Sequence, residues 1–220
     1  VDRLLRRGSL YAGSCGSGAY LLDDEGDYYR VHFFFSVDDP VDFEPMDKPV
    51  LVEFLVTRGE RSEATEKMEK KWMDAGFRPH VVDLKMHLPL KDYAPTPTVV
   101  ENEAGQFVGR LAVEEDADQI LPIWGSALDR LNSAIPGRDE LIYEIEMGNI
   151  FVMDRDGEVA AANKMVIRGG MVSTWLGAVK PEYRRMGLST AMKQMIYKTA
   201  IDRGIRMCYT WVDKENTASV

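Results

Sequence analysis

Apolar and polar positions in the first half of the chain form short runs that turn residues separate. The runs are rich in β-branched and aromatic residues, which predicts strands. These strands are expected at 19–22, 28–37, 50–57 and 80–88. Apolar residues also recur at helical spacing from Ser62 to Ala75 and stop before Gly76, which predicts one helix ending at a glycine. The first half therefore combines a small sheet with a single helix.

The second half shows the same two periods in longer segments. Strands are expected at 111–113, 149–153, 158–167, 171–179 and 206–212, and helices at 114–131, 139–147 and 188–204. Pro122 lies within the first of these helices and predicts either a kink or a later start. The order of strand, two helices, three strands, helix and strand predicts an α+β fold. Its sheet is mixed and mostly antiparallel, is flanked by helices, and has one crossover through a helix.

A proline-containing stretch divides the two halves. Residues 90–105 follow Pro89, include Pro95 and Pro97, and contain few apolar clusters. We therefore expect a first domain over 1–95, a linker over 96–108 and a second domain over 109–220.

Composition narrows the classes of function. The chain has 220 residues, of which 45% are hydrophobic, and a net charge of −9, which argues against nucleic acid as a partner. The apolar runs are strand-sized, so neither a membrane span nor an export signal is expected. Cys15 and Cys208 lie far apart and show no metal-ligand spacing, which favours the reducing cytoplasm and predicts no metal site.

The stretch GSCGSG at 13–18 has the glycines of a phosphate-binding loop but not the context of one. Only 19–22 separate it from the next turn, so no helix can point its N-terminus at an anion. It lacks the Lys-Ser/Thr ending of a nucleotide loop, and Asp23 and Asp24 follow closely. We interpret it as a flexible connection between strands, which makes a nucleotide-binding protein a poor hypothesis.

The junction between the strand at 171–179 and the helix after it is better suited to an anion. Pro181 ends the strand, and Gly187 and Ser189 form a turn of small residues into the helix. The start of a helix leaves backbone N–H groups unpaired at the positive end of its dipole. Arg184 and Arg185 add charge just before it, so a pyrophosphate would meet amides, dipole and guanidinium groups together.

These residues resemble a known family. Arg184–Ser189 is similar to the Arg/Gln-x-x-Gly-x-Gly/Ala acetyl-CoA loop of the GNAT superfamily of N-acetyltransferases, with Ser189 in place of the final small residue. Val179–Tyr183 resembles the Val-x-Pro-x-Tyr segment that precedes that loop. The resemblance covers the C-terminal half and implies a GNAT fold there, with the family's next helix and last two strands to follow Val220. Through Trp72–Phe77 it also implies that the first half is a degenerate second copy without the phosphate turn.

The resemblance implies an N-acetyltransferase that moves an acetyl group from acetyl-CoA to a primary amine in a ternary complex. The acceptor would be a small-molecule or peptide amine, and a homodimer stays open. The strand backbone would hold the pantetheine arm and polarise the thioester, and the turn would bind the pyrophosphate. The implied cofactor-binding residues are Gly177, Ala178, Val179, Arg184, Arg185, Met186, Gly187, Leu188, Ser189, Thr190 and Asn216.

A general base is harder to find in the sequence. The strand at 171–179 contains no Asp or Glu, and all three histidines lie in the first half. Glu144 and Glu146 on the short helix and Asp213 after the last strand are the remaining candidates. The alternative is a non-catalytic acyl-CoA-binding module, which would keep the turn and need no base.

Overall fold

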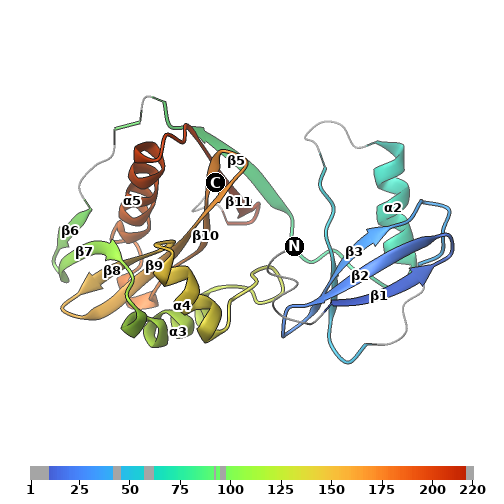
Figure 1. Cartoon of the computed structure of the whole chain (residues 1–220), viewed down its shortest axis with the longest axis horizontal. Helices are drawn as coiled ribbons and strands as arrows, with labels where there is room; N and C mark the ends of the chain where they lie inside the picture. Colours follow the sequence, from blue (N-terminus) through green and yellow to red (C-terminus); the bar gives the residue numbers. More distant parts are fainter. Residues whose placement is uncertain (1–9, 42–45, 57–61, 92, 95–97, 217–220) are drawn as a thin grey trace. The chain divides into compact units, whose positions relative to one another are not determined.

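The computed structural model describes residues 10–41, 46–56, 62–91, 93–94 and 98–216. The chain divides into two compact units, Val1–His80 and Val81–Val220. Each unit has its own sheet, and Figure 1 labels their elements. None of the helices in the described ranges is long and apolar enough to cross a membrane.

The described residues of the first unit form a four-stranded sheet with helix α2 packed against it. Its elements are β1 (Leu10–Cys15), β2 (Gly18–Asp24), β3 (Tyr29–Phe34), β4 (Val50–Val52) and α2 (Glu63–Asp74). Strands β1, β2 and β3 form an antiparallel meander, and β4 pairs parallel with β3. Trp72 of α2 is 1% exposed and packs among the rings of Phe33, Phe35 and Phe77. This aromatic cluster is the core of the unit.

The GSCGSG stretch is a β-hairpin. Gly16 and Ser17 connect β1 to β2, and Gly16 has a φ of 59°, where a side chain would meet Asp39 and Pro40. The backbone N–H and hydroxyl of Ser17 donate to Asp39 Oδ1 at 2.8 and 2.6 Å, and the N–H of Ser36 donates to Oδ2 at 2.8 Å. The interpretation as a strand connection is confirmed, and Asp39 holds its turn in place.

The second unit is built on a seven-stranded sheet in the order β5-β11-β10-β9-β8-β7-β6. Its strands are β5 (Asp83–Pro89), β6 (Val99–Asn102), β7 (Gly105–Leu111), β8 (Ile150–Arg155), β9 (Glu158–Arg168), β10 (Met171–Val179) and β11 (Met207–Asp213). All neighbours are antiparallel except β10 and β11, which are parallel. The predicted α+β class and its single parallel crossover are confirmed.

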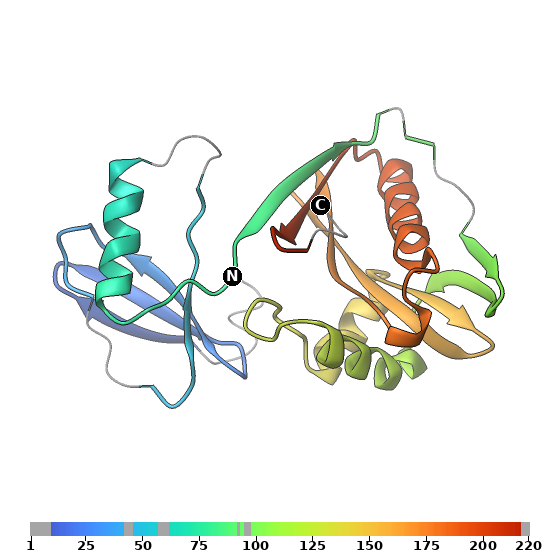
Figure 2. The same cartoon turned by 180° about the vertical axis from the view of Figure 1, so that it is seen from behind.

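Helices cover both faces of this sheet. They are η1 (Glu114–Asp116), α3 (Ala117–Ala127), α4 (Arg138–Glu146), η2 (Pro181–Tyr183) and α5 (Leu188–Asp202). One core joins α3 and α4 to one face, and another joins α5 to the opposite face. Figures 1 and 2 show α5 on one side of the sheet and α3 and α4 on the other. Helix α3 continues through Pro122.

Pairing between distant segments decides where several elements belong. Strand β5 precedes the proline-containing stretch, yet it lies in the second unit because all seven of its residues pair with β11. The expected linker at 96–108 contains β6 and the start of β7, which form a hairpin at the far edge of the sheet. The polar residues and glycine of this hairpin are compatible with a strand at the edge of a sheet, but the same composition predicts a loop from sequence alone.

Candidate functional site

Strands β10 and β11 are paired along only part of their length. The parallel register contains two pairs, Val172 with Cys208 and Ser173 with Tyr209. One residue further on, the hydroxyls of Thr174 and Thr210 lie 3.2 Å apart. Beyond this point each strand continues without being paired to the other, so the sheet opens between them.

A β-bulge interrupts β10 beside this opening. Trp175 pairs with Lys164 and Ala178 with Ala162, so two residues, Leu176 and Gly177, face one residue of β9. Leu176 has a φ of 50°, in the left-handed region that side chains disfavour. A bulge leaves the backbone groups of one residue out of the ladder. Backbone groups of the bulge, Leu176 and Gly177, are therefore outside the β9–β10 ladder.

Beyond the bulge, the hydrogen bonds show which backbone groups face the opening. The N–H of Lys180 donates to the carbonyl of Ala160 on β9 at 2.9 Å. Because backbone groups alternate in direction along a strand, those of Ala178 also face β9 and those of Val179 face away. Accordingly, the Val179 carbonyl accepts from Nε of Arg184 at 3.3 Å. The opening is thus lined by Val179 and the bulge, while Ala178 is committed to β9.

The loop between β10 and α5 is fixed to the β8–β9 hairpin by one carboxylate. Glu158 accepts from Nζ of Lys180 at 2.7 Å and from the hydroxyl of Tyr183 at 3.0 Å. The Tyr183 ring packs edge-on against Phe107, with centroids 5.2 Å apart. The hydrogen bond from Lys180 lowers the pKa of Glu158, and the bond to Glu158 raises the pKa of the Tyr183 hydroxyl. Both ends of η2 are therefore held in place.

The N-cap residue of helix α5 is Gly187, which has no side chain to cap the first N–H groups of the helix. Gly187 has a φ of 83° and Arg185 a φ of 66°, and these two left-handed residues turn the chain sharply into the helix. The first helical bond runs from the N–H of Ala191 to the Gly187 carbonyl at 3.0 Å. Within the described ranges, the N–H groups of residues 188–190 have no hydrogen-bond acceptor, as expected for an uncapped helix start. With the helix dipole behind them, these N–H groups have the geometry and the electrostatic potential that suit an anion.

The side chains around this turn divide between solvent and core. Leu188 is 1% exposed and packs in the core beneath α5, and Met186 packs against the same core. Leu188 can therefore reach a ligand only through its backbone, whereas Met186 is half-buried. The exposed side chains around the turn are those of Arg184, Arg185, Ser189 and Thr190. The structure therefore brings the predicted turn residues together at one exposed helix start.

The remaining predicted residues lie at different places. Glu144 accepts from Nζ of Lys164 at 2.7 Å and from Nδ2 of Asn149 at 2.8 Å, so an ion pair engages it, and Glu146 is exposed at the end of α4. Asp213 ends β11 and receives the N–H of Glu215 at 2.9 Å. Continuing the β10–β11 register places Asp213 across the opening from the bulge. Asn216 is exposed in the turn after β11, where its N–H donates to the carbonyl of Asp213 at 2.9 Å.

The surroundings of Cys208 on β11 make its thiol unreactive. The thiol lies 2% exposed under α5, and burial raises its pKa. A thiol that stays protonated is a poor nucleophile. Cys208 is a core residue of β11.

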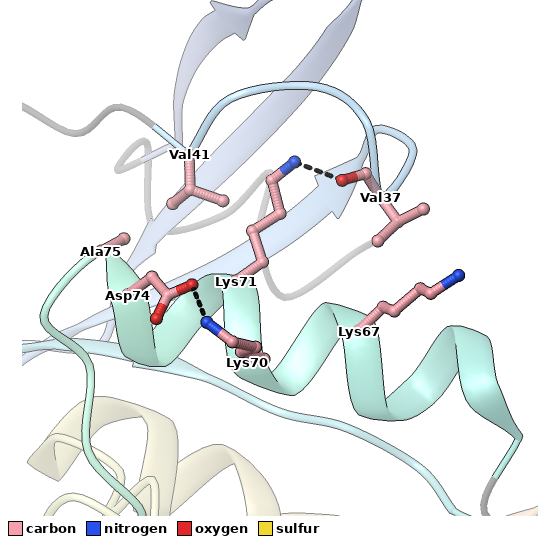
Figure 3. Close-up of a pocket in the computed structure, with 7 residues that line it drawn as sticks. All are labelled: Val37, Val41, Lys67, Lys70, Lys71, Asp74 and Ala75. Carbon is pink, nitrogen blue, oxygen red and sulfur yellow. Dashed lines mark hydrogen bonds and ion pairs between the residues drawn. The ribbon is translucent and has the colours of Figure 1, made fainter.

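A lysine-lined hollow in the first unit was not anticipated from the sequence. Figure 3 shows Lys67, Lys70 and Lys71 of α2 around it. Lys67 pairs with Glu63 and Lys70 with Asp74, each at 2.6 Å, and Lys71 donates to the carbonyl of Val37 at 2.6 Å. Because each ammonium group already has an acceptor, the hollow offers less to an anion than the start of α5.

Residues missed at the sequence level depend on pairing between strands. Asn163 faces the bulge from β9, and Glu158 fixes the loop. The signal for Asn163 was present, since it is the only amide side chain in the strand EVAAANKMVIR. Its meaning required knowing which residues of β10 lie opposite.

Comparison with known proteins identifies this architecture. Residues 142–215, which include β8 to β11 and α5, match the family model described as acetyltransferase (GNAT) domain. No curated protein matches the chain.

One solved structure shows the same fold. The chain resembles a GCN5-related N-acetyltransferase from Sphaerobacter thermophilus with a TM-score of 0.54 and 16% identity, over 70% of this chain and 50% of that one. It also resembles an N-acetyltransferase from Staphylococcus aureus Mu50, with a TM-score of 0.45 and 23% identity over 51% and 77% of the two chains. The chain spans about half the length of the Sphaerobacter protein. The family match and the shared fold agree: residues 142–215 of the C-terminal unit match the GNAT acetyltransferase domain, and the fold is similar to that of a GCN5-related N-acetyltransferase.

Proposed function

We propose that the C-terminal unit binds acetyl-CoA at the junction of β10 and α5. It would transfer the acetyl group directly to a primary amine of a small molecule or a peptide. The observation that carries this proposal is the coincidence of two features at one point of the fold. The sheet opens between β10 and β11 after Thr174, and the loop 180–187 after the same strand leads into the unpaired N–H groups at the start of α5.

Each feature suits a different part of acetyl-CoA. The pyrophosphate binds the N–H groups of residues 188–190, with Arg184 and Arg185 beside it. The pantetheine arm lies in the opening and bonds to the backbone of Gly177 and Val179. Ala178 contributes to the shape of the opening, because its own backbone groups face β9. In this proposal Asn216 lies beyond the other edge of the opening, at the end of β11.

The chemistry needs a positioned amine and a polarised thioester. The amine nitrogen attacks the thioester carbonyl carbon, the C–S bond breaks, and CoA leaves as a thiolate that takes up a proton. Holding the two reactants in attack geometry can supply about 7–11 kcal/mol of the barrier. The bulge amide stabilises the oxyanion that forms during attack.

Of the three carboxylates predicted as general base, Asp213 is the best placed. Glu144 is bound by Lys164 and Asn149, and Glu146 lies at the outer end of α4. Asp213 is across the opening from the bulge. Side chains alternate along β11, so Asp213 shares the face of Tyr209 and Trp211, opposite the face that packs under α5. Pyrophosphate and acceptor would then approach from opposite faces of the sheet.

Two measurements test this function. Thermal shift with acetyl-CoA, CoA and ATP separates binding classes, and we expect stabilisation by the two CoA species. Stabilisation by ATP alone would contradict the proposal. Release of free thiol from acetyl-CoA across a panel of primary amines then measures transfer. Tight CoA binding without turnover on any amine would favour the alternative, a non-catalytic acyl-CoA-binding module.

The Asp213 assignment has its own test. Asp213→Asn should leave CoA affinity within about threefold and lower turnover about 100-fold, within the range typical of general-base removal. Glu146→Gln is the matched control, since it neutralises an exposed carboxylate of the same unit. If Glu146→Gln lowers turnover and Asp213→Asn does not, the base is on α4.

A further inference from the structure

One buried side chain beside the opening is not accounted for by packing. Asn163 of β9 is 1% exposed, and its neighbours on the same face, Ala161 and Met165, are fully buried apolar residues. Its Oδ1 is buried without a hydrogen-bond partner among the residues that the structure describes. A buried polar atom without a partner costs stability, and an apolar residue of the same shape would avoid that cost. Asn163 is therefore a poor choice for stability alone.

The carboxamide lies where it can reach the opening. Asn163 is the residue of β9 that faces the bulge, and its Nδ2 would lie 2.8 Å from a Cβ built on Gly177. Because Gly177 has no side chain, the amide nitrogen occupies the space beside its Cα. Gly177 itself is exposed at the edge of β10. The glycine thus leaves Nδ2 as a hydrogen-bond donor next to the bulge.

We propose that Nδ2 of Asn163 donates a hydrogen bond to the carbonyl oxygen of the bound acetyl thioester, as a second donor beside the bulge backbone amide. This inference rests on the proposed function. The bulge fixes the height of the carbonyl oxygen along β10, and Asn163 lies at that same height on the face where α5 packs. Two fixed donors in a buried setting stabilise the negative charge that develops on this oxygen during attack. The unpartnered Oδ1 is the consequence of keeping the amide nitrogen there.

The donor role gives an unusual expectation for substitution. Asn163→Leu keeps the shape, removes the buried polar group and should leave the melting temperature equal or higher. It should lower turnover about 100-fold, the effect typical of losing one oxyanion donor. A structural role predicts the opposite, a lower melting temperature with turnover per folded molecule unchanged.

A spectroscopic measurement tests the donor without knowledge of the acceptor. The infrared stretch of acetyl-CoA labelled with ¹³C at the acetyl carbonyl is recorded free and bound to the full chain. We expect the bound band of the wild type to lie at lower frequency than the free band, and Asn163→Leu to lose a large part of that shift. Asn163→Asp, which keeps the shape but has no donor, should lose it as well. CoA affinity should stay within about threefold in Asn163→Leu, because the turn supplies most of the binding.

Asn102→Leu is the matched control. Asn102 also has a buried amide atom, Nδ2, without a partner among described residues, but it lies in the β6–β7 hairpin. This variant should leave the carbonyl band unchanged. An unchanged band in Asn163→Leu with acetyl-CoA bound would overturn the donor role and leave the proposed function standing. Failure of the wild type to bind acetyl-CoA would overturn both. Loss of folded protein in both Asn163 variants would assign the residue to stability and overturn the donor role.

Discussion

The two units share the same order of four strands. They differ in the residues that lie where the last two of these strands separate. In the first, the antiparallel meander β1–β2–β3 is followed by β4 parallel to β3, and in the second, β8–β9–β10 is followed by β11 parallel to β10. In both, the parallel pairing covers only the start of the meander's last strand, residues 29–31 and 172–173. Each sheet therefore offers the same place for an opening. We propose on this basis that the first unit is a degenerate copy of the second.

The contents of that place decide whether a ligand can enter. In the first unit, Phe33, Phe54 and Trp72 fill it, with ring centroids 5.4 to 6.4 Å apart. In the second unit, Gly177 lies in the bulge with Ala178 next to it, and the loop 180–187 after this strand leads into α5. The described residues that leave β3 in the first unit form a loop pinned by Asp39. A shared strand order is thus not sufficient for a ligand site. A site also needs small residues beside the opening and a helix that starts close to it.

Removing the aromatic side chains from the first unit should have the largest effect on stability, and this effect should be confined to that unit. Trp72→Ala leaves a cavity among four phenylalanine rings and should cost about 3–5 kcal/mol of unfolding free energy. Hydrogen exchange should show the loss in β1 to β4 and α2, with CoA affinity unchanged. Phe54→Leu is a milder control in the same cluster. Weaker CoA binding in both variants would show that the two units are energetically coupled.

Placing a carboxylate at the start of α5 tests the second half of the comparison. Gly187→Asp adds strain at a φ of 83° and negative charge beside the phosphate site, so CoA affinity should fall more than about 100-fold. Isothermal titration measures the change. Gly170→Asp is the control, because Gly170 has a φ of 74° and open space around it but lies in the β9–β10 hairpin. Equal affinity in the wild type and Gly187→Asp would refute the anion site.

Sequence periodicity could predict most elements because it reports local geometry. The stripe from Leu188 to Ile196 predicted α5, and the proline and glycine around Arg184 and Arg185 predicted its turn. These signals depend on residues within one helical turn or one strand end. The turn that we propose as the anion site could therefore be predicted before the fold was known.

Features that depend on pairing between strands could not be predicted from the local sequence in the same way. Strand β5 joins the second sheet through β11, more than one hundred residues later. Asn163 gains its position from a bulge in the neighbouring strand, and Glu144 is occupied by Lys164 of β9. No local period encodes such partners. The general base was for this reason harder to choose than the cofactor turn.

The Asp39 turn should respond to pH in a way that α5 does not. Hydrogen bonds from Ser17 and Ser36 hold the pKa of the Asp39 carboxyl far below its usual value. A lowered pKa contributes stability that is present above the ordinary carboxyl pKa and is lost as pH falls through the folded value. Thermal melts between about pH 6 and about pH 2 should therefore show the first unit losing more stability in the wild type than in Asp39→Asn. Parallel curves for the two proteins would contradict this.

The smallest expected effect concerns the support of the phosphate turn. Glu158 is half-exposed, and its bonds to Lys180 and Tyr183 hold the loop before α5, so Glu158→Gln should weaken CoA binding only about threefold. The loss should diminish at high salt, since the Lys180 pair is screened there. Glu182→Gln is the control, because Glu182 lies exposed in the same loop and its substitution removes the same negative charge. An equal effect of both variants would mean that CoA binding depends on the net charge of the loop and not on the anchoring of Tyr183.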